Sequence, residues 1–361
     1  MIGIIGFNSL KYMQFLNIYK DILDDIGVGY EVVFWNREGD EQPRHDNYFG
    51  FNETVDTFTP FIKKVPAFIR YVLFVKRQIK SKKYDKLIIL TTQTAVPLGR
   101  LLFKKYKKKY IFDYRDVTYE RFAFYHRLVK RLARNSAFTA VSSPKFLDTL
   151  KTDKAKFVVS HNCSKLRAEY VEKASADKIR IVYWGMIRQT EFVKRLCDAF
   201  ANDERIELTF HGKGYGNAEL AEYTAKNRYA NIYFTGIYKR DQIKSFAENT
   251  DILLNTYEND PVQQPAMTVK LYDAMRYGLP MLVTKDSYMA RFSEKYGLGL
   301  SFDLDDERSV DRVVEWYGGL KQDELRKNCS AAIEVINKDN RAFVDDVIKF
   351  ADGENSEQSV F

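Results

Sequence analysis

Cysteine is scarce in this chain of 361 residues, which contains only Cys163, Cys197 and Cys329. An odd number of cysteines without close spacing argues against a disulfide scaffold and against a zinc site, and it fits a reducing compartment. No run of eighteen apolar residues occurs, so we expect no membrane-spanning helix. The first six residues are too short for a signal-peptide core and lack a basic leader, so we expect a cytoplasmic protein.

The residues that are abundant favour two globular domains with separate cores. The chain is long for one domain, and 45% of its residues are hydrophobic and 15% aromatic. The net charge is +8, but residues 61–134 hold 21 Lys or Arg against 4 Asp or Glu, and the remainder sums to −9. This asymmetry indicates an anionic partner for the first half, namely membrane headgroups, a phosphorylated acceptor or nucleic acid.

Short apolar runs alternate with helical patterns, and this alternation begins twice along the chain. It predicts an α/β fold with two parallel sheets. A polar loop is expected at 37–59, and the charged segment 164–178 is expected to connect the two halves. Strands are expected at 2–6, 30–35, 87–90, 110–112, 138–141 and 157–160, and again at 179–184, 206–210, 232–234, 252–255, 281–283 and 300–302. Helices are expected at 12–26, 61–79, 96–103 and 125–134, and beginning near residues 191, 217, 240 and 267.

The stretch 255–284 is the most informative part of the sequence, since it predicts strand, loop, helix, turn and strand. A helix beginning near Met267 at the carboxyl end of a strand points free N–H groups and a partial positive charge outward. Such a terminus is an anion site, and phosphate is its usual occupant. Lys270 and Asp273 lie about one turn apart on this helix. A cation for phosphate and a carboxylate for sugar hydroxyls suit a nucleotide-sugar, although two surface charges on an ordinary helix are the alternative.

The segment Asp273-Ala274-Met275-Arg276-Tyr277-Gly278-Leu279-Pro280 carries a family resemblance. It resembles the donor-binding helix of GT-B glycosyltransferases, especially the family 4-like enzymes of bacterial capsule and exopolysaccharide synthesis. That helix carries two acidic residues separated by seven others. Asp273 matches the second acid, whereas the first falls on Pro265, with Gln263 or Gln264 as neutral substitutes.

The resemblance implies two Rossmann-like, doubly wound parallel-sheet domains that face a crevice. Residues 1–165 would bind the acceptor and residues 178–337 the nucleotide-sugar. Residues 338–361, with a helix at about 341–351, would cross back to the first domain. The resemblance also implies transfer with retention of anomeric configuration. The family has no agreed protein nucleophile, so we name no nucleophile here.

The family binds the donor diphosphate with a glycine, an arginine and a lysine after the first strand of the second domain. Gly185, Arg188 and Lys194 are the corresponding residues here, with altered spacing. Two cations matter because the leaving diphosphate gains negative charge as the glycosidic bond breaks. Asp251 and Asp260 do not form an Asp-x-Asp metal motif, and we expect neither metal nor cofactor. The predicted donor-binding residues are Gly185, Arg188, Lys194, His211, Gly212, Lys213, Gly214, Gly236, Thr268, Val269, Lys270 and Asp273.

The run Gly212-Lys213-Gly214-Tyr215-Gly216 superficially suggests a dinucleotide site. That fingerprint needs an acid at the end of the next strand, where this chain has Phe234-Thr235-Gly236. We therefore discount NAD. The resemblance implies instead that this glycine turn and Gly236 approach the nucleotide, and His211 is either a ligand-side or a purely structural residue.

Acidic residues gather after the strand at 110–112, in Asp113-Tyr114-Arg115-Asp116 with Glu120 nearby. Asp116 or Asp113 is the predicted catalytic group that orients or deprotonates the acceptor hydroxyl. Glu120, with Gly6 and Asn8 of the first turn, is predicted on the acceptor side. The alternative is that these acids pair with Arg115 and Arg121 and cap a helix. Ser142-Ser143 lacks the histidine and acid of a hydrolase triad.

Lys63, Arg70 and Arg77 recur at seven-residue intervals and share one face of the expected helix at 61–79. Apolar residues around them fit an amphipathic surface on an anionic bilayer better than nucleic-acid binding, for which no motif occurs. A core helix with solvated lysine tips is the alternative. A membrane surface also suits an acceptor carried on a lipid diphosphate.

Together these patterns predict a cytoplasmic sugar transferase held peripherally at the inner face of the membrane. It would move a sugar from a nucleotide-sugar to a hydroxyl acceptor, for which a glycan on polyprenyl diphosphate is the favoured candidate. Two rivals stay open. One is a GT-B-fold nucleotide-sugar epimerase, which needs acids and histidines around the sugar. The other is a non-catalytic sugar-nucleotide-binding or assembly subunit, which the missing acid at Pro265 makes plausible.

Overall fold

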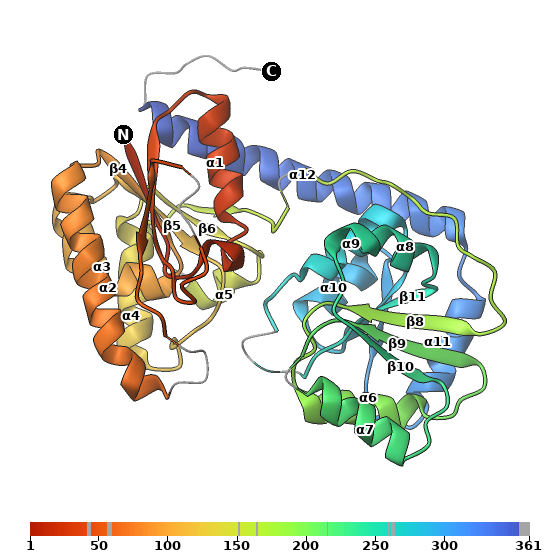
Figure 1. Ribbon diagram of the computed structural model, residues 1–361. Helices are drawn as coiled ribbons and strands as arrows, with labels where there is room; N and C mark the ends of the chain where they lie inside the picture. Colours follow the sequence, from red (N-terminus) through yellow and green to blue (C-terminus); the bar gives the residue numbers. More distant parts are fainter. Residues whose placement is uncertain are drawn as a thin grey trace. The chain divides into compact units, whose positions relative to one another are not determined.

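The structure is a computed structural model in which the chain divides into two units (Figure 1). One unit comprises Met1–Ser164 with Lys338–Phe361, and the other comprises Lys165–Asn337. None of the described helices is long and apolar enough to cross a membrane. The described residues are 1–41, 45–55, 60–150, 152–163, 165–214, 216–258, 260 and 264–353. The predicted tail at 354–361 and Gln263 lie outside them.

The first unit is built on a seven-stranded parallel sheet with the order β3-β2-β1-β4-β5-β6-β7. Its strands are β1 (Ile2–Ile5), β2 (Tyr30–Trp35), β3 (Tyr48–Phe51), β4 (Lys86–Leu90), β5 (Tyr110–Tyr114), β6 (Phe138–Val141) and β7 (Phe157–Val159). The six strands expected from the sequence are confirmed. The expectation of a loop over the whole of 37–59 is wrong, because this segment contains β3. This edge strand pairs in parallel with β2, and the Phe51 ring packs edge-on against Trp35 at 5.8 Å.

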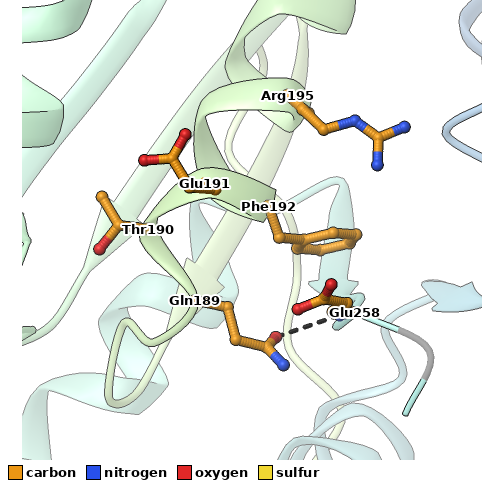
Figure 2. A pocket seen from close by; sticks show the side chains of 6 residues that line it. All are labelled: Gln189, Thr190, Glu191, Phe192, Arg195 and Glu258. Carbon is orange, nitrogen blue, oxygen red and sulfur yellow. Dashed lines mark hydrogen bonds between the residues drawn. The ribbon is translucent and has the colours of Figure 1, made fainter.

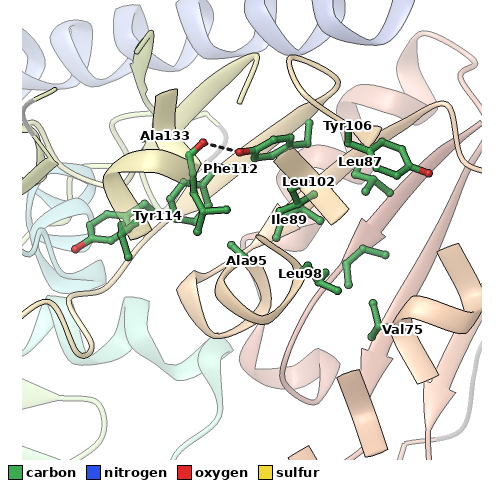
Figure 3. Packing of buried hydrophobic residues seen from close by; sticks show 14 of the residues in the cluster. Val75, Leu87, Ile89, Ala95, Leu98, Leu102, Tyr106, Phe112, Tyr114 and Ala133 are labelled. Carbon is green, nitrogen blue, oxygen red and sulfur yellow. Dashed lines mark hydrogen bonds between the residues drawn. The ribbon is translucent and has the colours of Figure 1, made fainter. Parts of the chain in front are cut away.

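Helices cover both faces of the first sheet. One face packs against α2 (Phe61–Lys82), α3 (Thr92–Lys105), α4 (Ala123–Asn135) and α5 (Phe146–Leu150). Figure 3 shows this core, in which strand residues such as Leu87 and Ile89 meet Leu98 and Leu102 of α3. The other face packs against α1 (Leu16–Asp25), which follows the short 3-10 helix η1 (Leu10–Tyr12), and against the C-terminal helix.

The second unit repeats the plan with a six-stranded parallel sheet, ordered β10-β9-β8-β11-β12-β13. Its strands are β8 (Ile179–Trp184), β9 (Ile206–His211), β10 (Ile232–Gly236), β11 (Ile252–Asn255), β12 (Met281–Thr284) and β13 (Gly299–Phe302), all of which were predicted. One face packs against α6 (Thr190–Phe200), α7 (Asn217–Lys226) and α11 (Ser309–Gly318). The remaining elements are η2 (Arg240–Gln242), α8 (Ile243–Glu248), α9 (Val269–Tyr277) and α10 (Tyr288–Lys295). The helices α10 and α11 were not predicted.

The last helix, α12 (Gln322–Asp352), is 31 residues long and far exceeds the helix expected at 341–351. No glycine or proline interrupts it, so nothing in its sequence ends the helix early. Its residues belong to the second unit as far as Asn337 and to the first unit from Lys338. Phe343, Val347 and Phe350 lie in the core of the first unit.

We predict that Phe343→Ala destabilises the first unit by about 3–5 kcal/mol, the usual cost of removing a buried phenylalanine ring. The Phe343 ring is 1% exposed and packs edge-on against Tyr19 at 5.3 Å. Native-state hydrogen exchange should show loss of protection in β1–β7, while exposed Asp345→Ala changes little. A loss of protection confined to β8–β13 would contradict this role of α12.

Candidate functional site

The strand order of the second sheet reverses between β8 and β11, which lie side by side in parallel. After β8 the chain continues to α6 on one face, and after β11 it continues to α9 on the other. In open parallel sheets, ligands bind outside the carboxyl ends of the strands at such a switch point. The residues that follow β8 and β11 are therefore the candidate site.

Lys270, the second residue of α9, is the central group of this site. Its side chain is only 7% exposed, and its Nζ lies 4.2 Å from the ring centre of Tyr183 and 5.0 Å from that of Tyr257. A desolvated cation over aromatic rings gains about 2 kcal/mol. Among the described residues no carboxylate forms an ion pair with Lys270. A buried cation without a protein anion leaves room for an anionic ligand.

In the described part of the chain, no side chain caps the helix terminus beside Lys270. The residue before the helix, Thr268, makes no side-chain cap, because its hydroxyl donates to Asn255 Oδ1 at 2.9 Å instead. Val269, the first helical residue, is 41% exposed. The first N–H groups of α9 are thus left for a ligand, with the positive end of the helix dipole behind them. Thr268 and Val269 therefore lie where the sequence predicted a phosphate site.

Gly185 brings the backbone after β8 against Lys270. Its φ is +133°, a conformation that favours glycine, and a Cβ built there would lie 3.5 Å from Lys270 Nζ. Three residues later Arg188 is exposed, and its Nε lies 3.3 Å from Met186 Sδ. Burial raises the pKa of Tyr257 to about 12, and the nearby charge of Arg188 opposes that shift. Arg188 and Lys270 thus place two cations around Tyr257.

Lys194, which the sequence places among the donor residues, pairs with two carboxylates of the protein in this structure. Its Nζ forms ion pairs with Glu191 at 2.8 Å and with Glu219 of α7. The hydrogen bonds to these two carboxylates raise the pKa of Lys194. Spacing along the sequence suggested a second phosphate cation, but the helical geometry turns this side chain toward α7.

Asp273 lies one turn after Lys270 and is 7% exposed. Its Oδ2 accepts a hydrogen bond from Trp184 Nε1 at 3.0 Å, which fixes the carboxylate at the end of β8. Burial raises the pKa of Asp273, and the hydrogen bond from Trp184 acts against this shift. The position matches the sequence prediction, while the tryptophan partner was not foreseen.

The glycines after β9 have a packing role that the sequence did not reveal. A Cβ on Gly212 would lie 1.8 Å from the carbonyl oxygen of Gly185, so only glycine lets the loops after β8 and β9 meet here. The Ile187 N–H donates to the carbonyl of exposed Lys213 at 3.0 Å, and Ile187 forms a β-bridge with Gly214. These glycines therefore position the Gly185 loop.

His211 and Gly236 lie next to this loop. The His211 ring stacks on Phe246 with 3.8 Å between centroids, and its Nδ1 is 2.7 Å from the Thr235 hydroxyl. Burial lowers the pKa of His211. These contacts supply the structural role considered above, whereas Gly236, with φ +82° and open space at its Cβ position, stays a candidate for ligand approach.

In the first unit, Asp113 is fully buried and engaged with other side chains. It accepts hydrogen bonds from Arg115 Nε at 2.7 Å and Nη2 at 3.0 Å, and from the Tyr19 hydroxyl at 2.6 Å. Arg115 Nη1 also donates to the Ser160 carbonyl and to Asn162 Oδ1. The prediction that Asp113 acts as a catalytic base is therefore corrected, because its carboxylate is enclosed and paired.

The other residues that the sequence predicts on the acceptor side differ in their exposure. Asp116 is exposed, so it stays the candidate base. Glu120 is 7% exposed, and its Oε2 accepts from the Thr118 N–H. The Gly6 carbonyl accepts from the Tyr71 hydroxyl, and Asn8 Oδ1 accepts from Arg37 at 3.2 Å. Gly6 thus packs inside the unit, while Asn8 is held by Arg37.

Known proteins match this chain in three-dimensional structure but not in sequence. No protein-family model matches the chain, and no curated protein sequence matches it. Solved structures do. A sucrose-phosphate synthase from Thermosynechococcus elongatus matches with TM-score 0.68 and 12% identity over 97% of both chains. HepE of Anabaena in complex with UDP and glucose matches with TM-score 0.65 and 13% identity, over 95% of this chain and 98% of that one.

A third structure, the lipopolysaccharide outer core galactosyltransferase WaaB, has a TM-score of 0.64 at 14% identity and covers 95% of this chain and 98% of its own. The chain has the GT-B fold. This result confirms the predicted fold class of two Rossmann-like parallel-sheet domains. In this GT-B protein, the group of residues around Lys270 lies in the second Rossmann-like unit.

Residues that the sequence reasoning missed complete the site. Tyr183, Trp184 and Tyr257 orient Lys270 and Asp273, and Gln189 and Glu258 follow directly after Arg188 and Tyr257. The sequence feature that could have identified them is their position, since each lies within a few residues of the end of β8 or β11. Within the described ranges, no group of three or more His, Cys, Asp or Glu is arranged as metal ligands.

We predict that Asp113→Ala destabilises the first unit by about 3–5 kcal/mol, because it leaves the Arg115 guanidinium buried without its counter-charge. Chemical denaturation should show this loss, while exposed Asp25→Ala stays within about 0.5 kcal/mol of wild type. A stable Asp113→Ala protein that has lost only activity would restore Asp113 as a catalytic residue.

Proposed function

We propose that this protein transfers a sugar from a nucleotide-sugar to a hydroxyl acceptor, with retention of anomeric configuration. The observation that carries the proposal is Lys270, a buried cation at an uncapped helix terminus, without a carboxylate partner among the described residues. The neighbours support the ligand class, since HepE was solved with UDP and glucose and an E. coli neighbour with UDP-2-fluoro glucose.

In this proposal the donor diphosphate binds to Lys270, Arg188 and the first N–H groups of α9. As the glycosidic bond breaks, negative charge builds on the leaving diphosphate, and these fixed positive groups stabilise it. Asp273, held by Trp184, accepts hydrogen bonds from the ribose hydroxyls. A neighbouring trehalose-6-phosphate synthase was studied for glycosyltransfer with retention, which supports the stereochemical part.

The epimerase alternative has little chemical support in the second unit. His211 is the single histidine in the sequence between residues 165 and 337, and its ring is stacked on Phe246. The non-catalytic alternative rests on Pro265, which stands where the family has an acid. Slow hydrolysis of the donor without acceptor would distinguish an enzyme from a binding subunit, because only an enzyme breaks the glycosidic bond.

We further propose an acceptor carried on a lipid, such as a capsular or exopolysaccharide intermediate on polyprenyl diphosphate, reached at an anionic membrane surface. The support is the outer face of α2, where Ile62 is 80%, Ile69 52% and Leu73 51% exposed. Exposed Lys63 and Arg77 flank these residues. We name these five residues the α2 stripe. An apolar face beside cations suits an anionic bilayer.

Arg70 contributes less to this surface than its spacing suggested. Its guanidinium pairs with Glu53, so its charge is partly neutralised within the protein. The buried face of α2, which includes Ala67, Tyr71 and Val75, packs on the sheet. The helix therefore has a buried apolar face and an exposed apolar face. Packing on the sheet accounts for the buried face only.

We predict that Lys270→Ala weakens nucleoside-diphosphate binding by about 1.5–3 kcal/mol, the range for a charge-assisted hydrogen bond. Calorimetry with UDP, GDP and ADP measures this loss, and Lys226→Ala, an exposed lysine on α7, is the matched control. Unchanged affinity in a folded Lys270→Ala protein would move the donor site elsewhere.

We predict that the protein sediments with vesicles that contain anionic lipid, and that high salt reduces this binding without abolishing it. Each basic residue near the surface contributes about 1 kcal/mol within the Debye length. Lys63→Glu with Arg77→Glu should remove the salt-sensitive part, and Ile62→Ser with Leu73→Ser the salt-resistant part. Lys226→Glu with Arg228→Glu in the second unit is the control. Equal sedimentation with neutral vesicles would exclude the α2 stripe as a membrane surface.

A further inference from the structure

A cavity of about 310 Å³ lies between the start of α6 and Glu258, which follows β11 (Figure 2). This volume is at the lower end of the usual range for small-molecule sites, about 300–1,000 Å³, and suits one sugar ring. Its lining residues are Gln189, Thr190, Glu191, Phe192, Arg195 and Glu258. No role was assigned to any of them from the sequence.

The cavity is connected to the two phosphate cations through the backbone. Gln189 directly follows Arg188, and Glu258 directly follows Tyr257, whose ring contacts Lys270. Adjacent Cα atoms are about 3.8 Å apart, so the backbone of the cavity wall lies next to Arg188 and Tyr257. The sugar of a nucleotide-sugar is bonded to the diphosphate, so this neighbouring cavity is a candidate for the sugar.

The wall of the cavity is fixed in place by hydrogen bonds. The Glu258 N–H donates to Gln189 Oε1 at 3.1 Å, a bond drawn in Figure 2. The Tyr257 N–H donates to Thr284 Oγ1 at 2.7 Å, and the Thr284 hydroxyl donates back to the Tyr257 carbonyl at 2.8 Å. A preorganised wall loses little entropy when it binds a ligand.

The chemistry of the lining suits a hydroxylated ring. Half-buried Phe192 offers an aromatic surface, and Glu258 offers two acceptor oxygens for hydroxyl donors. Within the described part of the chain Glu258 has no cationic partner, whereas Glu191 pairs with Lys194 and Arg195 pairs with Asp305. The uncompensated charge in the cavity is therefore negative.

We propose that this cavity holds the sugar of the donor, that Glu258 supplies the carboxylate absent at Pro265, and that the sugar is a neutral pyranose. This inference rests on the proposed function. A sugar acid would place its carboxylate against Glu258, and like charges at short distance repel. The cavity thus selects neutral sugars over uronic acids.

The test compares calorimetric affinities of UDP, UDP-glucose and UDP-glucuronate, together with GDP and GDP-mannose in case guanosine is preferred. We expect wild type to bind the neutral nucleotide-sugar more tightly than the bare diphosphate, and UDP-glucuronate about tenfold more weakly than UDP-glucose. Glu258→Gln should weaken the affinity for the neutral nucleotide-sugar about tenfold. It should also reduce the difference in affinity between UDP-glucose and UDP-glucuronate. Phe192→Ala should weaken the nucleotide-sugars, and both variants should leave the bare diphosphate unchanged.

The control is Glu222→Gln, which alters an exposed carboxylate on α7. Variants of Glu258 and Phe192 that weaken the diphosphate as much as the nucleotide-sugar, or that change neither, would overturn the inference while the proposed function stands. Tight wild-type binding of UDP-glucuronate would overturn it as well. If no nucleoside diphosphate binds wild type, the proposed function itself fails. If Lys270→Ala has no effect on a diphosphate that does bind, the donor site lies elsewhere. In either case the inference fails with it.

Discussion

The candidate site depends on one buried cation, Lys270, whose Nζ is held over the rings of Tyr183 and Tyr257. A buried ammonium is costly unless its surroundings offset the loss of hydration. Aromatic faces do so in part and keep the charge available, whereas a carboxylate would neutralise it. The arrangement places a positive charge at the end of α9, where the helix dipole adds to it. The proposed roles of Gly185, Arg188 and the start of α9 depend on this position of Lys270.

Backbone packing supports that cation. Gly212 allows the loop after β9 to lie against Gly185, and Gly185 in turn brings the chain after β8 to Lys270. Trp184 hydrogen-bonds Asp273 from the same strand end. Residues at the end of β8 therefore contact both charged residues of α9, namely Lys270 through Tyr183 and Asp273 through Trp184.

Charged residues occur in two different settings in this structure. In the first unit, Asp113 and Arg115 neutralise each other in the interior and tie β5 to α1 through Tyr19. In the second unit, Lys270 and Glu258 carry charges without ion-pair partners among the described residues. Paired buried charges stabilise a structure only when both partners stay, whereas unpaired charges in a site attract ligands. Pairing, rather than residue type, is therefore the criterion by which we propose Lys270 and Glu258, and not Asp113, as ligand-binding groups.

The sequence alone determined the two parallel sheets and the place of Lys270, because short apolar runs, glycine stops and helix starts are local signals. It missed β3, whose four residues lie inside a polar stretch, and it did not reveal the partners of Asp113 and Lys194. Tertiary structure decided those cases because the partners are remote: Tyr19 lies 94 residues from Asp113, and Glu219 lies 25 residues from Lys194. The pairing of a charge depends on which segments the fold brings together, and neither spacing nor composition encodes that locally.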